Sequence, residues 1–351
     1  LGPYTPSVHI GWDTGIQPAA KQEGNVAFAS QSGGHASTLL RAGRGFYYTM
    51  GLSFGNQIDV NCLEVLEYYA ADPKTEVIGL YLEDTGSAKG SDFFKTLREI
   101  TPKKPVIIWK GGQTEIGARA AASHTGAMSG SLKIWRSMTK QAGGIFTEHS
   151  EEFWDIIHLL SILVPYKKLR PCKNLGLIIP GGGDSVEATD MFSRFGFNVP
   201  VLTKETQDKI SALVPPVNTS VKNPVDLGAT GGFDRVFLSS IKFVAEDPNI
   251  DIVIHYQPID WISGAEIQFG ATGYAGTAAR AIGRLAKRLE KPLVQVMPIL
   301  KLDRNIAEIY PKFMEILRQN GVPYFSSRKR LAIALTHLNE YVQFLKVRKK
   351  L

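Results

Sequence analysis

The chain has 351 residues, 44% of them hydrophobic, and a formal net charge of +7. Its length predicts two globular domains of roughly 150–200 residues each, and no apolar run approaches the ~20 residues that cross a bilayer. The basic residues are spread along the chain without interleaved aromatic side chains, which argues against nucleic-acid binding. The two cysteines, Cys62 and Cys172, offer neither a disulfide framework nor metal-ligand spacing. We therefore expect a protein of a reducing compartment, the cytoplasm, with no membrane or nucleic-acid partner.

Buried strands alternate with helices in the first half of the chain. A predicted strand at 26–29 leads into SQSGG (30–34), where a glycine pair opens a helix. A second strand precedes GLSFGNQID (51–59), and two more follow at 77–82 and 106–109. Continuous apolar strands of this kind are typical of a parallel sheet that helices cover on both faces.

The second half repeats this layout. NLGLIIPGGGDSV (174–186) matches NVAFASQSGGHAS (25–37), an offset of 174 − 25 = 149 residues. Three later pairs keep the same order: 247–260 with 72–84, 290–299 with 103–112, and 319–338 with 141–160. The repeat predicts an α/β protein of two tandem flavodoxin-like, doubly wound parallel-sheet domains, residues 1–166 and 167–351.

Functional residues of such sheets gather at the carboxyl edge, where strands end and helices begin. The candidates of the first domain follow four successive strands: Ser30, Ser32, Gly33 and Gly34; Gly55 and Asn56; Glu83; and Lys110.

A loop with one histidine extends the first copy of the repeat at this edge. The distance from Pro105 to Gly143 is 38 residues, whereas the matching distance from Pro292 to Gly321 is 29. The additional length of about nine residues contains AASHTGAMSG (121–130) and thus His124. Additional loop length beside a candidate site favours a functional role.

A histidine on a loop of small residues could bind a metal, act as a general base or serve as a nucleophile. The sequence has no HxH, HExxH or CxxC motif for a metal and no GxSxG elbow for a serine nucleophile. A histidine that itself carries a phosphoryl group needs a carboxylate to orient its ring and donors for the dianion. Glu83 can supply the first, and the glycine-rich helix starts at 30–34 and 180–184 can supply the second.

Several motifs together resemble the NDP-forming acyl-CoA synthetases, relatives of succinyl-CoA synthetase that include the ADP-forming acetate–CoA ligases of archaea. In the first half these motifs are SQSGG, SFGNQIDV, LYLED and GARAAASHTGAMSG. In the second half, PGGGDSVEATD (180–190) and VKNPVDLGATGGFDRV (221–236) resemble the family's other ligase domain. The resemblance covers nearly the whole chain.

The resemblance implies a role for each candidate residue. His124 is implied to be the phosphorylated histidine and Glu83 the carboxylate that hydrogen-bonds it. Gly55 and Asn56 are implied to lie where an acyl phosphate forms. The implied phosphate-binding residues are Ser30, Ser32, Gly33 and Gly34, then Thr125 and Gly126 beside the histidine, and Gly182 and Gly183 at the matching helix of the second domain.

The implied reaction converts acyl-CoA, phosphate and ADP to a carboxylate, CoA and ATP through an acyl phosphate and phospho-His124. The family's CoA-binding domain and its ATP-grasp nucleotide domain have no counterpart in this sequence. We therefore expect an ATP-grasp subunit or fused domain, which would hold ATP or ADP with Mg²⁺, and a CoA-binding domain. The expected assembly is a hetero-oligomer or multidomain dimer that acts on a small carboxylic acid.

Two alternatives compete with this interpretation. The first is a catalytically inactive or regulatory relative of the same scaffold, against which the retained His124 and Glu83 argue. The second is a plain Rossmann-type nucleotide-binding module, against which the lack of GxGxxG spacing in SQSGGHAS argues.

Overall fold

The computed structural model describes residues 3–5, 23–41, 45–117, 131–232, 234–262, 264, 273–301 and 303–348. The chain divides into two compact units, Leu1–Ser161 with Glu340–Leu351, and Ile162–Asn339. The domain boundary expected between residues 166 and 167 stays a prediction.

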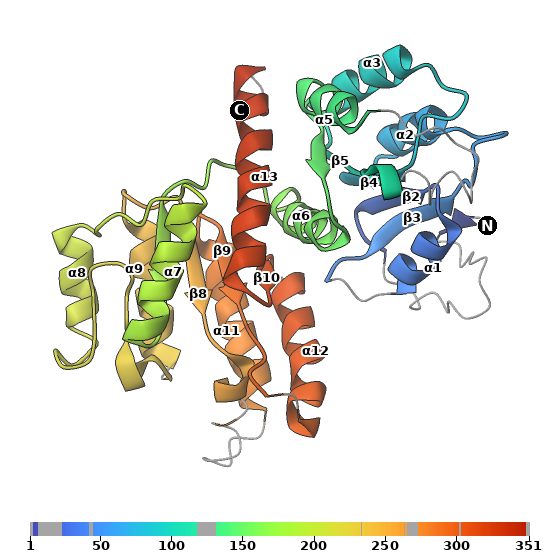
Figure 1. Cartoon of the computed structure of the whole chain (residues 1–351). Helices are drawn as coiled ribbons and strands as arrows, with labels where there is room; N and C mark the ends of the chain where they lie inside the picture. The colour runs from blue at the N-terminus through green and yellow to red at the C-terminus, as the bar shows by residue number, and fades with distance from the viewer. Residues whose placement is uncertain are drawn as a thin grey trace. The chain divides into compact units, whose positions relative to one another are not determined.

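The first unit contains a six-stranded sheet of order β1-β3-β2-β4-β5-β6 (Figure 1). The short β1 (Pro3–Tyr4) pairs antiparallel with β3, and all other pairs are parallel. The parallel strands therefore follow the flavodoxin order 2-1-3-4-5. They are β2 (Val26–Ser30), β3 (Tyr48–Ser53), β4 (Val77–Leu82), β5 (Val106–Lys110) and β6 (Ile145–Thr147).

Helices cover both faces of this sheet. Ile78, Leu80 and Leu82 of β4 lie in one apolar cluster with residues of α2, α3 and α5. The alternate residue Gly79 faces Phe153 of α6, because successive strand residues point to opposite faces. The helices described in this unit are α1 (Gly33–Arg41), α2 (Cys62–Ala71), α3 (Gly90–Ile100), α5 (Leu132–Gln141) and α6 (Ser150–Leu163).

The second unit contains a parallel four-stranded sheet of order β10-β9-β8-β7. Val225 forms an isolated parallel bridge with Ile178 on the free side of β7, so this sheet also follows the order 2-1-3-4-5. Its strands are β7 (Leu175–Ile178), β8 (Ile252–Tyr256), β9 (Leu293–Val296) and β10 (Tyr324–Phe325). The predicted fold class, two tandem flavodoxin-like sheets, is confirmed.

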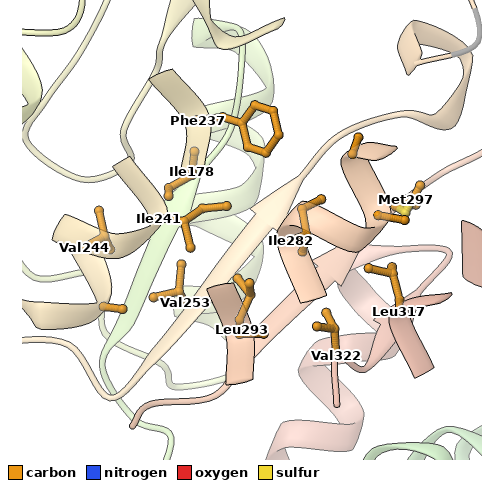
Figure 2. Close-up of a cluster of buried hydrophobic side chains, with 14 of the residues drawn as sticks. Ile178, Phe237, Ile241, Val244, Val253, Ile282, Leu293, Met297, Leu317 and Val322 are labelled. Atoms are coloured by element: carbon orange, nitrogen blue, oxygen red, sulfur yellow. The ribbon is translucent and has the colours of Figure 1, made fainter. Parts of the chain in front are cut away.

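The core of the second unit joins its strands to several helices. Ile178, Val253 and Leu293 of the strands pack in a single buried cluster with Ile241 of α9 and Ile282 of α11 (Figure 2). Phe313 and Leu317 of α12 complete this cluster. The elements described in this unit are α7 (Gly182–Arg194), α8 (Lys204–Ser211), the 3₁₀ turn η2 (Gly228–Gly232), α9 (Asp234–Glu246), α11 (Tyr274–Arg288), α12 (Arg304–Gln319) and the start of α13 (Arg328–Val347).

Local capping explains where some of these helices begin. Asn61 precedes α2, and its side chain accepts hydrogen bonds from the backbone N–H groups of Leu63 and Glu64. The Glu64 carboxylate accepts from the Asn61 backbone N–H at 2.9 Å, which completes a capping box. Thr203 and Asp303 cap α8 and α12 in the simpler way, with one side-chain bond each to a first-turn N–H.

Within the described residues, none of the helices combines the length and the apolar character that crossing a membrane requires.

Candidate functional site

Glu83 lies one residue beyond the end of β4, at the carboxyl edge of the first sheet. Its side chain is buried, with 8% of the residue exposed. Oε1 of its carboxylate accepts a hydrogen bond from the Tyr81 hydroxyl at 3.3 Å. Oε2 is buried and has no hydrogen-bond partner among the residues that the structure describes. A buried carboxylate oxygen without a donor is costly, so this atom is suited to accept from a group that enters the edge.

Two amide side chains fix the loop that carries Glu83. The Gln31 side-chain oxygen accepts from the backbone N–H groups of Glu83 at 2.7 Å and Asp84 at 3.2 Å. Its Nε2 donates to Asp84 Oδ1 at 3.1 Å, and Gln57 Nε2 donates to the same oxygen at 2.8 Å. The Gly86 N–H is a third donor to that oxygen, at 2.9 Å. We call Gln31, Gln57 and Asp84 the edge clamp, because it ties together the loops that follow β2, β3 and β4.

Three aromatic rings lie against one another beside Glu83. Tyr81 and Trp109 are register partners on β4 and β5, with ring centroids 4.7 Å apart. The His35 ring, from the first turn of α1, lies 4.7 Å from the Tyr81 ring and 4.9 Å from the Trp109 ring. Burial lowers the pKa of His35, and the Glu83 carboxylate partly offsets this effect. Burial and the Glu83 carboxylate raise the pKa of the Tyr81 hydroxyl, which therefore remains a donor at neutral pH.

The N-terminus of α1 adjoins this edge. Ser30 Oγ accepts from the Ser32 backbone N–H at 3.1 Å and donates to the Ser32 carbonyl at 2.7 Å. Ser32 Oγ accepts from the His35 N–H at 3.3 Å and so caps the helix. Gly33 and Gly34 supply the remaining N–H groups of the first turn, where the helix dipole favours an anion.

The loop after β3 joins the same edge through its backbone. The Phe54 N–H donates to the Ser30 carbonyl at 3.2 Å. Gly55 follows with φ +58° and Gln57 with φ +59°, so the chain turns through the left-handed region here. Asn56 is exposed between them. The structure therefore brings Gly55 and Asn56 to the edge that holds Ser30 and Glu83.

Lys110 ends β5 but lies on the other face of the sheet. It pairs in register with Leu82, and its ammonium group lies 5.7 Å from the Trp135 ring centroid. The ammonium group is buried and donates to the Gly111 carbonyl. Burial lowers the pKa of Lys110, and the Asp84 and Glu83 carboxylates oppose that shift. Lys110 thus points to the face of the sheet opposite Tyr81 and Trp109.

The matching helix of the second unit, α7, begins without a side-chain cap. Gly181 precedes it with φ +103° and makes no side-chain cap bond, and among the described residues no side-chain acceptor for the first-turn N–H groups is found. Gly182 and Gly183 are exposed, and a Cβ atom at either position would meet no heavy atom within 4 Å. Asp226 holds the approach to this helix, because its Oδ1 accepts from the N–H groups of Gly181 and Gly228 at 2.9 Å each.

A cavity of about 170 Å³ lies at the carboxyl edge of the second sheet. One of its buried polar residues is His255, with 3% of the residue exposed, and Nδ1 of the His255 ring lies 3.0 Å from Gln295 Oε1. Burial lowers the pKa of His255 to about 4, so the ring is neutral at pH 7. The rest of the lining is mostly apolar: Ile178, Pro180, Leu227, Gly228, Gly231, Gln257, Trp261, Ile262 and Tyr274.

The first unit matches the family described as "Succinyl-CoA ligase like flavodoxin domain" over residues 23–160. One relative is subunit alpha of the ADP-forming acetate–CoA ligase II of Pyrococcus furiosus. It is 30% identical over 318 residues, which cover 89% of this chain and 64% of that subunit. The ADP-forming 4-hydroxybutyrate–CoA ligase of Nitrosopumilus maritimus is 29% identical over 330 residues, or 92% of this chain and 43% of that ligase.

A solved structure extends this similarity to the whole chain. The dinucleotide-forming acetyl-coenzyme A synthetase 1 of Ca. Korarchaeum cryptofilum, in complex with phosphate and ADP, has a TM-score of 0.78 at 27% identity. The similarity covers 100% of this chain and 71% of that one. Over nearly its whole length the chain is thus similar to members of the NDP-forming acyl-CoA synthetase superfamily. It spans less than two thirds of the length of the two curated relatives. Since both are named as ligases, they give no support to the alternative of an inactive member of this superfamily.

The site residues predicted for this synthetase relative fall into three groups. Ser30, Ser32, Gly33, Gly34, Gly55, Asn56 and Glu83 meet at one edge of the first unit, whereas Gly182 and Gly183 open α7 of the second. His124, Thr125 and Gly126 lie outside the described residues. In the part of the chain that is described, no cluster of three His, Cys, Asp or Glu side chains could hold a metal ion.

Sequence reasoning missed the edge clamp and Tyr81. Gln31, Gln57, Tyr81 and Asp84 all stand inside the motifs that carry the resemblance, but their partners lie up to 53 residues away. A signal was present, since polar residues at the ends of buried strands need hydrogen-bond partners.

We predict that the edge clamp depends on Asp84 as an acceptor more than as a charge. Asp84→Ala removes the side-chain acceptor of the buried Gln31 and Gln57 amides, although Gln57 Nε2 keeps its 3.3 Å bond to the backbone carbonyl of residue 84. The change should lower the free energy of unfolding by about 2–4 kcal/mol. Asp84→Asn keeps Oδ1 and should cost less than about half of that. Urea unfolding of both variants measures the difference, and equal losses would contradict the prediction.

We also predict an acid-sensitive step in stability that originates at His255. Its pKa is about 4 in the folded chain against 6.5 for the free side chain, so the unfolded chain binds the additional proton between these values. Stability is therefore full above pH 6.5 and falls as the pH drops toward 4, by up to about 3 kcal/mol. His255→Gln cannot titrate and should flatten this limb in urea unfolding at pH 7 and pH 4.5. The matched change at the exposed His149 should leave the limb intact, and an unchanged limb in His255→Gln would refute the assignment.

Proposed function

We propose that this chain carries the phosphohistidine step of an ADP-forming acyl-CoA synthetase. In the proposed reaction, acyl-CoA and phosphate give an acyl phosphate and CoA, and His124 takes the phosphoryl group and releases the carboxylate. Phospho-His124 then passes the group to ADP and forms ATP. The observation that carries this proposal is the buried, unpartnered Oε2 of Glu83 beside the N-terminus of α1.

The proposed role of Glu83 follows from the chemistry of an imidazole nucleophile. A ring nitrogen attacks phosphorus only when it is unprotonated, so the proton must sit on the other ring nitrogen. A carboxylate that accepts that N–H fixes the tautomer and stabilises the positive charge that develops on the ring. Oε2 of Glu83 can accept this bond, because it has no partner among the described residues; Tyr81 donates to the other oxygen, Oε1.

The proposed role of the helix starts is to hold the transferred dianion. The first-turn N–H groups of α1 at Gly33 and Gly34, and those of α7 at Gly182 and Gly183, offer donors at the positive ends of two helix dipoles. Fixed dipoles stabilise charge without having to reorganise during the reaction. The absence of Cβ atoms at Gly182 and Gly183 keeps the approach to α7 open.

The remaining parts of the reaction belong to proposed partners. An ATP-grasp subunit or fused domain would hold ATP or ADP with Mg²⁺, and a CoA-binding domain would hold the thioester. The relative in Pyrococcus furiosus is named as a subunit alpha, which fits an assembly in which the parts are divided. Cys62 and Cys172 are free and buried, which fits the proposed cytoplasmic location.

We further propose that the cavity of the second unit receives the carbon chain of the small carboxylic acid. Its apolar lining and neutral His255 suit an uncharged body better than a second anionic group. Gly55 and Asn56 of the first unit are the residues proposed for the acyl phosphate.

The cavity proposal predicts a change of acid preference. Trp261→Ala widens the cavity and should shift kcat/KM by about 10-fold or more in favour of bulkier acids, since one buried methylene is worth about 1 kcal/mol or more in such pockets. Acid-dependent CoA-thioester formation with the partners present measures the shift. Phosphorylation by ATP should stay unchanged, and an unaltered preference would place the acid elsewhere.

The decisive test of the proposed function is phosphoryl incorporation. Labelled ATP with Mg²⁺ and a nucleotide-binding partner, or acetyl phosphate alone, should label the wild-type chain. The label should be acid-labile and base-stable, absent in His124→Asn and present in the matched His149→Asn. An unlabelled chain with its partner shown to bind would favour the inactive relative instead.

A further inference from the structure

We propose that Tyr81 is a positioning residue that presents the Glu83 carboxylate through a single oxygen. The proposal rests on the proposed function, because it concerns the carboxylate that is proposed to orient His124. Tyr81 lies within β4, and the proposal gives its hydroxyl group a role in the reaction.

The strand register brings the Tyr81 hydroxyl to Glu83. Tyr81 and Glu83 are two residues apart, so they point to the same face of the sheet. The hydroxyl donates to Oε1 at 3.3 Å and is otherwise surrounded by buried groups, since Tyr81 is only 7% exposed. A Tyr hydroxyl remains protonated at neutral pH, so this donor is present throughout the reaction.

The ring that carries this hydroxyl is held on two sides. Trp109 lies beside it on β5, and His35 lies against both rings from α1. Rings packed in this way have few alternative rotamers. The hydroxyl therefore has a fixed direction, and the oxygen to which it donates is also fixed.

Gly111 leaves room for the pair. A Cβ atom at this position would lie 2.4 Å from the Tyr81 hydroxyl oxygen and 3.2 Å from Glu83 Cγ. The Gly111 N–H donates to the Leu82 carbonyl at 2.8 Å, which holds the glycine backbone against the end of β4. The hydroxyl and the carboxylate are thus confined between the ring packing and the backbone of residue 111.

The consequence is that the two oxygens of Glu83 are no longer equivalent. Oε1 already accepts from Tyr81, whereas Oε2 has no partner among the described residues, so Oε2 is the oxygen that an incoming ring N–H would bind. The hydrogen bond from the imidazole N–H to Oε2 then sets the plane of the ring, and Tyr81 acts on this bond only through the position of the carboxylate.

The test replaces the hydroxyl and keeps the ring. Tyr81→Phe in the full chain, assayed with its nucleotide-binding partner or with acetyl phosphate, should lower the rate constant of His124 labelling by about 10- to 100-fold. The donor concentration at half-maximal rate should stay unchanged, because Tyr81 contacts neither the donor nor the phosphoryl group. An unchanged rate constant would overturn the proposal.

Tyr69→Phe is the matched control. The Tyr69 hydroxyl is also buried and donates to the Phe28 carbonyl at 3.0 Å in the same unit. A merely structural hydroxyl should make both variants less stable and leave the labelling rates alike. A labelling loss in Tyr69→Phe equal to that in Tyr81→Phe would therefore refute the positioning role.

A double-mutant cycle with Glu83→Ala tests whether Tyr81 acts through Glu83. In that background, Tyr81→Phe should change the labelling rate by less than about twofold. A full additional loss would show that Tyr81 acts by another route and would overturn the proposal.

The hydrogen bond itself can be observed without any turnover. The ¹³Cζ resonance of Tyr81, assigned by its absence in Tyr81→Phe, should move in Glu83→Ala. If Glu83→Ala shifts this resonance but the wild-type chain takes no label on His124, the proposed function is wrong and the Tyr81–Glu83 contact is still supported. A resonance that does not move would overturn the positioning proposal directly.

Discussion

A single carboxylate oxygen, Oδ1 of Asp84, organises the carboxyl edge of the first sheet. It accepts hydrogen bonds from the side chains of Gln31 and Gln57 and from the Gly86 backbone. Bonds to a charged acceptor are stronger than neutral ones, and the two amides are buried, so the loss of any member leaves others unsatisfied. The loops after β2, β3 and β4 are therefore held as one piece. This arrangement also positions Glu83, since the Gln31 side-chain oxygen accepts a hydrogen bond from the Glu83 backbone N–H.

The two glycine-rich helix starts look alike in sequence and differ in structure. At α1, Ser30 and Ser32 use their hydroxyls on the turn itself, and Ser32 caps the helix. At α7 no side chain in the described part of the chain caps the first turn, and the carboxylate of Asp226 accepts a hydrogen bond from the backbone of Gly181, which precedes the helix. The first-turn N–H groups of α1 are thus partly satisfied by Ser32, whereas those of α7 can bind solvent or a ligand. This difference gives the two halves of an internal repeat unequal tasks in the proposed phosphoryl transfer.

The fold could be predicted because its signals are local and repeated. Apolar strands, glycine turns and amphipathic helices recur at an offset of 149 residues, and each segment needs only its own neighbours to be interpreted. The edge residues Glu83, Ser30 and Gly55 could be placed together for the same reason, since each follows a strand of one parallel sheet. The face toward which a strand-end residue points could not be predicted without the register. Lys110 was expected at the same edge, and it lies on the opposite face because it pairs with Leu82 and not with Tyr81.

The finer chemistry of the site depends on which atoms are already engaged, and no local pattern carries that information. Glu83 forms no ion pair among the described residues, and the ammonium group of Lys110 donates a hydrogen bond to the Gly111 carbonyl. The lowered pKa of His35 keeps that ring neutral at pH 7, so it provides no permanent cation for Glu83. A carboxylate locked to a permanent cation would hold a ring N–H weakly, whereas a carboxylate with no second donor holds it strongly. With the Tyr81 hydroxyl as its donor, Glu83 should hold a ring N–H with intermediate strength, because the hydroxyl stabilises the charge on the carboxylate and leaves Oε2 without a partner among the described residues. In the proposed reaction, this arrangement leaves Oε2 available to accept the ring N–H of the histidine.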